Sequence, residues 1–358
     1  MLSIRLAFSI SLCIVLISPA HGETAKSPTT LHESGSFNEA PYRIDVPEQW
    51  NGDLVMLLHG YEPKGALRKS PEPGNPATPL FLSQGYAVAS SHYSSQGWAV
   101  REAISDNEKL RQYFNKKVGT PHHTYLVGFS LGGHIALASL ESHLNSYDGA
   151  LSLCGVNMPA TTAFDEGILT NLVAFDRFYP NILPILDAPN SPPTIDRSVL
   201  EQALKSNETT AAALSNRLNI PRDGLAGSLA LDYLILKEAQ NRFAGFPASN
   251  LKTNYADFGN DAEFNQKVHR YSASESALKN LSSSSTLTGR ISKPVVLQPS
   301  DQDPTIPARL NQIYPTLVRA AKEDRYLLVL PPKGRGHCGF EEKDIQAAFQ
   351  RLVDMQKH

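Results

Sequence analysis

The chain has 358 residues, 41% of them hydrophobic, and a formal net charge of −2, which is the composition of an ordinary globular protein. Its length exceeds one typical domain, although α/β folds often run long as a single unit. The charge is nearly balanced, and no basic run is longer than the pair Lys116–Lys117. We therefore expect no nucleic-acid partner, because nothing indicates a surface that binds polyanions.

Residues 1–22 have the pattern of a secretory signal peptide. Arg5 precedes the apolar, uncharged segment 6–18, and small residues follow it. The segment is shorter than the ~20 residues that a membrane-spanning helix needs, so we expect cleavage after Ala20 or Gly22 and no stable membrane insertion. The sequence therefore predicts a secreted or periplasmic protein that loses Cys13 with its signal.

Strand and helix patterns alternate through the first part of the chain. Strands are predicted at 40–47, 53–60, 86–93, 123–130 and 149–156, and helices at 79–85, 99–117 and 131–144. Such alternation favours a parallel sheet with helices on both faces.

The alternation stops near residue 158. From there to residue 290 the pattern is helical with prolines, and one predicted helix has Leu229, Tyr233, Leu236 and Phe243 on one face. The serine-rich segment 280–289 is predicted to be a loop. Strand and helix patterns resume at 293–300, 307–322, 325–332 and 341–356. We expect a core formed by residues 23–157 and 291–358, interrupted by a helical insert at 158–290.

The segment Gly128-Phe129-Ser130-Leu131-Gly132 places a polar serine where a predicted strand turns sharply into a helix. Glycine two residues before and after the serine avoids side-chain collisions in such a turn. The following helix points the positive end of its dipole at the hydroxyl. A glycine-rich turn without chemistry is the alternative, but the flanking strand and helix are the context that a nucleophilic serine requires.

A serine hydroxyl needs a base to take its proton and an acid to orient that base. His337 is the only histidine between the last predicted strand and the final helix. Asp301 and Asp303 both follow an earlier strand. We prefer Asp303 because of its place in the turn after that strand, whereas Asp301 could instead cap the turn. The expected catalytic residues are Ser130, His337 and Asp303.

A reaction at Ser130 would also need backbone donors for a developing oxyanion. We assign these to the N–H groups of Tyr61 and Leu131, from the loop after the strand at 53–60 and from the residue after the serine. His59 is interpreted as a structural brace of that loop. The histidines, among them the pair His122–His123, do not have the spacing along the chain that is typical of metal ligands. We therefore expect no metal and no organic cofactor.

The motifs "HGY", "GFSLGG", "DQDPTIP" and "GHCGF" resemble those of the α/β-hydrolase superfamily in order and spacing, over about residues 53–358. The resemblance implies an α/β-hydrolase fold: a mostly parallel eight-stranded sheet, helices on both faces and a helical cap inserted after strand 6. It also implies hydrolysis through an acyl-enzyme. We expect a carboxylic ester hydrolase acting on a small molecule. The alternatives are a serine peptidase or aminopeptidase and a non-catalytic binding protein, since the fold does not choose the substrate.

The cysteines resemble in part those of secreted feruloyl esterases and tannases, where cysteines adjacent to the catalytic serine and histidine form a disulfide. This chain has Cys338 beside His337, but Phe129 precedes the serine. Cys154 ends the next predicted strand, so the resemblance implies a Cys154–Cys338 bridge; the alternative is two buried thiols.

Tyr93, Gln96 and Trp98 follow the strand predicted at 86–93. They could face a substrate, or they could form a turn packed under the insert. Asn207 and Asn280 match glycosylation acceptors, which matters only for a eukaryotic source.

Overall fold

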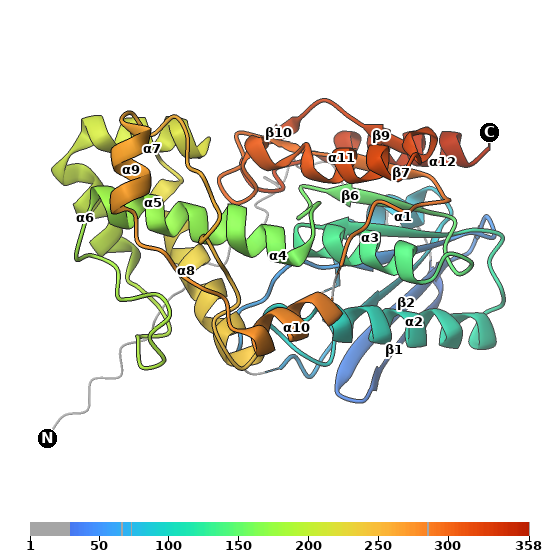
Figure 1. The fold of residues 1–358 in the computed structure, drawn as a ribbon. Coiled ribbons are helices and arrows are strands. Elements are labelled where there is room, and N and C mark those ends of the chain that lie inside the picture. Colours follow the sequence, from blue (N-terminus) through green and yellow to red (C-terminus); the bar gives the residue numbers. More distant parts are fainter. Residues whose placement is uncertain (1–28, 66, 73, 285, 358) are drawn as a thin grey trace, which may run out of the picture.

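Eight strands form one sheet in this computed structural model, which describes residues 29–357 apart from 66, 73 and 285. The spatial order is β1-β2-β4-β3-β5-β6-β7-β9. In Figure 1, β1 and β2 lie at one edge of the sheet and β7 and β9 lie at the other. The strands are β1 (Thr29–Phe37), β2 (Ala40–Pro47), β3 (Leu54–Leu58), β4 (Ala87–Ser91), β5 (Thr124–Phe129), β6 (Gly149–Leu153), β7 (Val295–Gln298) and β9 (Leu327–Val329). Only the pairs β1–β2 and β2–β4 are antiparallel. The predicted eight-stranded, mostly parallel sheet of an α/β-hydrolase fold is confirmed.

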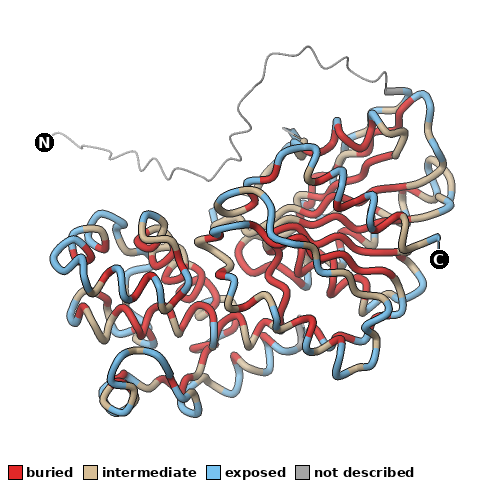
Figure 2. Tube along the Cα trace, turned by 90° about the horizontal axis from the view of Figure 1, so that it is seen from above, coloured by how far each residue is buried: buried red, intermediate tan, exposed pale blue. Residues whose placement is uncertain are grey.

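Helices cover both faces of this sheet, as predicted. Leu54, Met56 and Leu58 of β3 belong to one apolar cluster, whereas Val55 and Leu57 belong to the other. The first cluster includes residues of α2 (Val100–Lys117), α3 (Leu131–Ser142) and α11 (Ile313–Ala320), and the second includes α1 (Thr78–Ser83) and α12 (Glu342–Gln356). Because side chains alternate along a strand, continuous apolar runs are buried on both sides (Figure 2).

A helical insert follows β6, as the sequence predicts, and forms a lobe beside the sheet in Figures 1 and 2. It contains α4 (Ala160–Thr162), the π-helix η1 (Ala163–Leu169), α5 (Thr170–Phe178), α6 (Arg197–Ser206), α7 (Glu208–Leu218), α8 (Leu225–Arg242), α9 (Asp261–Lys267) and α10 (Glu275–Ser284). The apolar face predicted for α8 is buried throughout.

One local prediction is wrong. Residues 280–289 are not all loop, because α10 continues to Ser284. Ala277 and Leu281 lie one turn apart on this helix and are fully buried, so packing outweighs the weak helical preference of the serines.

The polar segment before Ala40, for which no strand is predicted, forms β1 and is paired along its length with β2. An edge strand needs few apolar residues, and here Phe37 stacks on Tyr42 at 4.5 Å.

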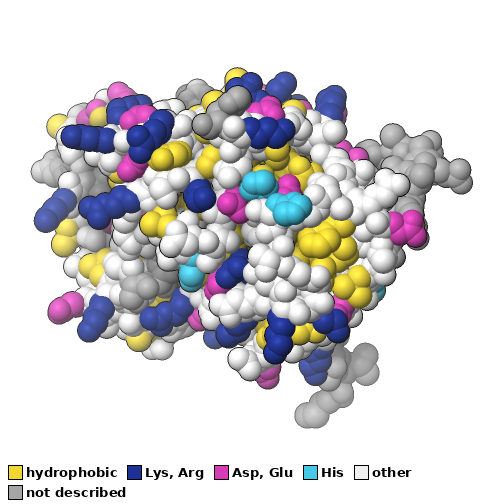
Figure 3. Space-filling model, turned by 90° about the vertical axis from the view of Figure 1, so that its right-hand side faces the viewer, with side chains coloured by type: hydrophobic (Ala, Val, Ile, Leu, Met, Phe, Trp, Pro, Cys, Tyr) yellow, Lys and Arg dark blue, Asp and Glu magenta, His cyan; other side chains and the backbone are white. Residues whose placement is uncertain are grey.

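On the face shown in Figure 3, Lys and Arg side chains are spread among Asp and Glu side chains. Within the described part of the chain, no helix has the length and apolar character that crossing a bilayer would require. The predicted signal peptide, residues 1–22, lies outside the described residues.

One arginine joins the insert to the second part of the core. Arg309, in the short 3-10 helix η2 (Ala308–Leu310), donates from Nη1 to the carbonyl of Glu166 at 2.8 Å and from Nε to that of Leu218 at 3.1 Å. Its Nη2 donates to Oδ1 of Asn171 at 2.8 Å, and Asn171 donates to Asp232 at 2.8 Å. Burial lowers the pKa of Arg309 to about 10 and raises that of Asp232 to about 7.

Replacing Arg309 by methionine should destabilise the protein, because two backbone carbonyls and an amide oxygen lose a charged donor at a packed interface. We expect Arg309→Met to lower the free energy of unfolding by about 2–4 kcal/mol, measured by urea denaturation. The control is Arg319→Met, whose side chain is 67% exposed and should change stability by no more than ~0.5 kcal/mol. Equal denaturation midpoints for the two variants would contradict this role.

Candidate active site

Ser130 occupies a strained turn between β5 and α3. Its φ of 55° and ψ of −123° lie outside the regions that residues with side chains normally occupy. A Cβ atom added at Gly128 would lie 2.0 Å from the carbonyl oxygen of Gly132, and one at Gly132 would lie 2.2 Å from that of Leu58. Only glycine fits at these two positions, so the sequence pattern reflects the close approach of three backbone segments.

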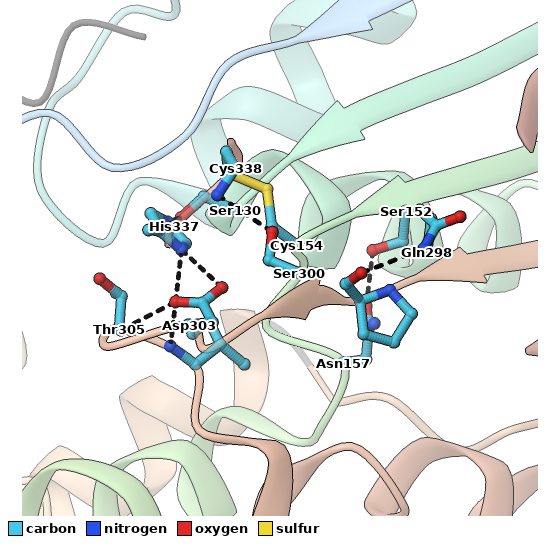
Figure 4. Close-up of a disulfide and its surroundings, with 12 residues drawn as sticks. Ser130, Ser152, Cys154, Asn157, Gln298, Ser300, Asp303, Thr305, His337 and Cys338 are labelled. Carbon is cyan, nitrogen blue, oxygen red and sulfur yellow. Dashed lines mark hydrogen bonds and ion pairs between the residues drawn. A yellow bond between two sulfur atoms is a disulfide. The ribbon is translucent and has the colours of Figure 1, made fainter. Parts of the chain in front are cut away.

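His337 connects this serine to a carboxylate. Its Nε2 lies 2.8 Å from Oγ of Ser130, and its Nδ1 lies 3.0 Å from both carboxylate oxygens of Asp303 (Figure 4). Because a carboxylate can only accept, Nδ1 carries the hydrogen, and in the neutral ring Nε2 is free to accept the serine O–H. The three side chains thus form one directed chain of hydrogen bonds.

Asp303, rather than Asp301, faces the histidine. The Asp303 side chain is 3% exposed, and its Oδ1 also accepts from the backbone N–H groups of Thr305 at 2.8 Å and Ile306 at 3.0 Å. These two donors hold the carboxylate in place. Asp301 is exposed, and its backbone carbonyl accepts from the N–H of Gly336 at 2.9 Å.

The loop that carries His337 is fastened on two sides. The short strand β10 (Lys333–Arg335) pairs in parallel with β8 (Ser300–Asp301), and neither short strand is predicted from the sequence. The predicted disulfide between Cys154 and Cys338 is present, with a Cα–Cα distance of 5.3 Å. The bridge therefore attaches the residue after His337 to the end of β6 (Figure 4).

The loop after β3 passes beside the serine. A Cβ atom added at Gly60 would lie 3.0 Å from Cβ of Ser130 and 3.5 Å from its Oγ. Nδ1 of His59 donates to the carbonyl oxygen of Gly60 at 2.8 Å. In a planar trans peptide, the N–H of Tyr61 points away from that carbonyl, so the His59 ring sets its direction. Leu131 is the first residue of α3, where backbone N–H groups have no acceptor within the helix.

Of the three predicted substrate contacts, two are packed side chains. Tyr93 is 3% exposed, and its ring stacks on His59 at 3.9 Å. Trp98 is 4% exposed and lies 4.9 Å from the ring of Phe164, in the insert. These placements favour the alternative, a turn packed under the insert. Gln96 is partly buried, and its Oε1 accepts from the N–H of Gly65 at 2.8 Å.

Helix α8 of the insert contacts loops on both sides of Ser130. Near its start, Ser228 donates to the carbonyl oxygen of Pro304, next to Asp303. Near its end, Glu238 accepts from the N–H of Trp98 at 3.1 Å, and Arg242 donates to the carbonyl of Gln96. The sequence holds no motif for these contacts, because they join segments that are distant along the chain.

A pocket of about 160 Å³ lies between the insert and the core. Its lining comes from two parts of the chain: Pro221, Asp223, Gly224, Gln302, Pro304, Arg335 and Gly336. Gln302 and Pro304 flank Asp303, and Gly336 precedes His337, so the pocket adjoins the loops that carry these two residues, although neither they nor Ser130 line it. The sequence does not predict this pocket, because the segments that line it are distant along the chain, as are those that contact α8.

Comparison with known sequences gives one partial match. The chain matches no protein-family model. A stretch of 138 residues is 27% identical to an o-phthalyl amidase from Xanthobacter agilis. The match covers 35% of this chain and only 28% of the amidase.

Solved structures with a similar arrangement include enzymes of different activity. A rice cell wall degrading esterase, LipA, from Xanthomonas oryzae is 16% identical, with 91% of this chain and 90% of that chain covered and a TM-score of 0.48. An acylaminoacyl peptidase from Pyrococcus horikoshii is 11% identical, with 94% and 42% covered and a TM-score of 0.47. Neither likeness identifies a reaction. By its own strand order, with the helical insert after β6, the chain has the α/β-hydrolase fold.

Proposed function

We propose that the protein is a serine hydrolase that cleaves carboxylic esters of small molecules through an acyl-enzyme. The observation that carries this proposal is the hydrogen-bonded chain from Ser130 through His337 to Asp303, with distances of 2.8 and 3.0 Å. Ser130 and His337 lie 207 positions apart in the sequence. A strained serine hydrogen-bonded to an imidazole, which is in turn hydrogen-bonded to a buried carboxylate, is the arrangement that nucleophilic catalysis by serine requires.

In the first half of the reaction, His337 accepts the proton of Ser130 at Nε2 while Oγ attacks the ester carbonyl carbon. His337 then donates this proton to the leaving alcohol oxygen, which leaves an acyl group on Ser130. In the second half, His337 takes a proton from water, the water oxygen attacks the acyl carbon, and Ser130 leaves with the proton. Asp303 holds Nδ1–H throughout and stabilises the imidazolium.

The oxyanion formed in each half needs donors beside Ser130. We assign these to the backbone N–H groups of Tyr61 and Leu131. The close approach of Gly60 to Ser130 and the position of Leu131 at the start of α3 support the assignment. Each such donor typically contributes ~3 kcal/mol of transition-state stabilisation.

Amide hydrolysis is the second candidate function, and the partial match to an o-phthalyl amidase favours it. The same residues would act, but His337 would have to protonate a leaving amine. We place esters first because an alcohol is expelled more readily than an amine. Ester cleavage therefore requires less help from the site in protonating the leaving group. A peptidase is a special case of the same chemistry. A non-catalytic binding protein would have no use for the strained serine.

For the organisation of the chain we propose a signal peptide at 1–22, a core of residues 23–157 and 291–358, and a cap at 158–290 that limits access to Ser130. The hydrogen bond from Ser228 of the insert to the carbonyl oxygen of Pro304, next to Asp303, supports a cap of this kind. The pattern of residues 1–22 and the Cys154–Cys338 disulfide together support export to an oxidising compartment, where structural disulfides persist.

Removing the nucleophile should abolish turnover. We expect Ser130→Ala to lower kcat for a short p-nitrophenyl ester by about a million-fold, since no other group replaces the attacking oxygen. The control is Ser142→Ala, at the far end of α3, which should retain full activity. Retained turnover in Ser130→Ala, or no adduct of a fluorophosphonate probe on Ser130 of the unaltered protein, would count against the proposal. The ratio of kcat/KM for matched esters and amides separates the two candidate functions.

The two aspartates should differ sharply. We expect Asp303→Asn to lower kcat by about 10⁴-fold, because an amide cannot hold His337 in the tautomer that accepts the serine proton. Asp301→Asn keeps the backbone carbonyl that accepts from Gly336, so its kcat should change by less than about threefold. Steady-state kinetics of the two variants give the test. A larger loss in Asp301→Asn would reverse the assignment of the acid.

The disulfide should contribute to stability. The two cysteines are separated by 184 positions in the sequence. A cross-link that closes a loop of this length lowers the conformational entropy of the unfolded chain, which stabilises the fold by about 5 kcal/mol. We expect the double variant Cys154→Ala/Cys338→Ala to have a Tm lower by roughly 5–10 °C, measured by calorimetry. A non-reduced digest of exported protein should contain one linked peptide pair. Two free thiols, together with an unchanged Tm in the variant, would contradict this expectation.

A further inference from the structure

Two histidines outside the Ser130 chain lie side by side at the carboxyl edge of the sheet. His59 directly follows β3, and His92 directly follows β4. These strands pair in parallel with Leu57 opposite Ser90, so their register brings the two histidines together. The ring centroids are 5.8 Å apart, and Glu62 lies in the same loop as His59.

The hydrogen bonds of the two rings fix their tautomers. Nδ1 of His59 contacts the carbonyl oxygen of Gly60 at 2.8 Å, and Nε2 of His92 contacts that of Pro71 at 2.9 Å. A carbonyl oxygen only accepts, so these two nitrogens carry the hydrogens. In the neutral rings, Nε2 of His59 and Nδ1 of His92 therefore present lone pairs.

These two lone pairs have no hydrogen-bond partner among the residues that the structure describes, although both nitrogen atoms are buried. Buried polar atoms without a partner are uncommon and call for an explanation. Glu62 adds a carboxylate, and one ligand atom from each of the three side chains lies within 4.8 Å of the others. Arg68 pairs with Oε1 of Glu62 at 2.5 Å, and a carboxylate offers a second oxygen.

Two unpartnered ring nitrogens and a carboxylate oxygen that lie within 4.8 Å of one another are close enough to bind a single cation. One water molecule could donate its two hydrogens to the two rings, whereas a divalent cation also takes a lone pair from the carboxylate. Two imidazoles and a carboxylate are a ligand set that Zn²⁺ uses, with a fourth position for water. Metal-binding histidines usually donate their other ring N–H to a carbonyl, as His59 and His92 both do.

We propose that His59, Glu62 and His92 bind Zn²⁺. The expectation of no metal came from spacing along the chain, whereas this set is assembled by the pairing of β3 with β4. The other group of candidate ligands among the described residues, Cys154, His337 and Cys338, is not available, because its sulfur atoms are joined to each other.

The site has a structural consequence for the loop beside Ser130. Zn²⁺ on Nε2 of His59 draws electron density from the ring and strengthens the bond that Nδ1–H donates to Gly60. The cation would thereby hold the Gly60–Tyr61 peptide in its present direction. Binding itself does not rest on the proposed hydrolysis, since the metal needs neither substrate nor Ser130.

The test is titration of the EDTA-stripped, dialysed protein with ZnSO₄ by calorimetry, without substrate. We expect one Zn²⁺ per chain, micromolar or tighter affinity, and a higher Tm with the metal. Glu62→Gln and His92→Gln should each weaken binding by about 100-fold. His123→Gln, at the amino end of β5, should leave binding unchanged, as should Ser130→Ala.

A second readout uses Co²⁺ as the probe, because tetrahedral Co²⁺ absorbs visible light. The unaltered protein and His123→Gln should both develop this band, and Glu62→Gln should not. Circular dichroism shows whether each variant is folded, and Glu62→Gln keeps the test valid if His92→Gln fails to fold. Absence of stoichiometric Zn²⁺ binding, or equal affinity in Glu62→Gln and the unaltered protein, would overturn the proposal.

Discussion

The contact between Nε2 of His337 and Oγ of Ser130 is the interaction on which the candidate site depends, and separate parts of the chain hold its two ends. The backbone of Ser130 is held in its unusual conformation by the close contact of Gly128, Gly132 and the end of β3. His337 is held through its ring by Asp303 and through its neighbour by the disulfide to β6. A loop position that would otherwise be mobile is thereby restricted on both sides.

Much of the fold could be predicted because its signals are local. The central strands are continuous apolar runs, and α2, α8 and α12 show helical periodicity, so their positions agree with the sequence to within a few residues. The errors arise where tertiary packing decides. The polar strand β1 exists because β2 pairs with it, and α10 extends because Leu281 is buried. Neither partner is visible in the segment itself.

The candidate site likewise contains residues that local sequence signals predict and contacts that they do not. Ser130 could be found from its glycines, and His337 from its position after the last strand. Asp303 and Asp301 lie too close together for spacing to separate them; their difference is the direction of a side chain, which turn geometry decides. The pairing of His59 with His92 depends on strand register, and the burial of Trp98 depends on a helix of the insert. Such contacts between distant segments have no local signature.

Helix α8 connects the insert to two separate loops of the core. Its 18 residues make a rod about 27 Å long, with Ser228 bonded to the carbonyl beside Asp303 and Arg242 bonded to the loop that holds Gln96. Both contacts lie on one rigid helix, so a displacement of α8 as a unit would disturb the turn that holds Asp303 and the loop that holds Gln96 at the same time.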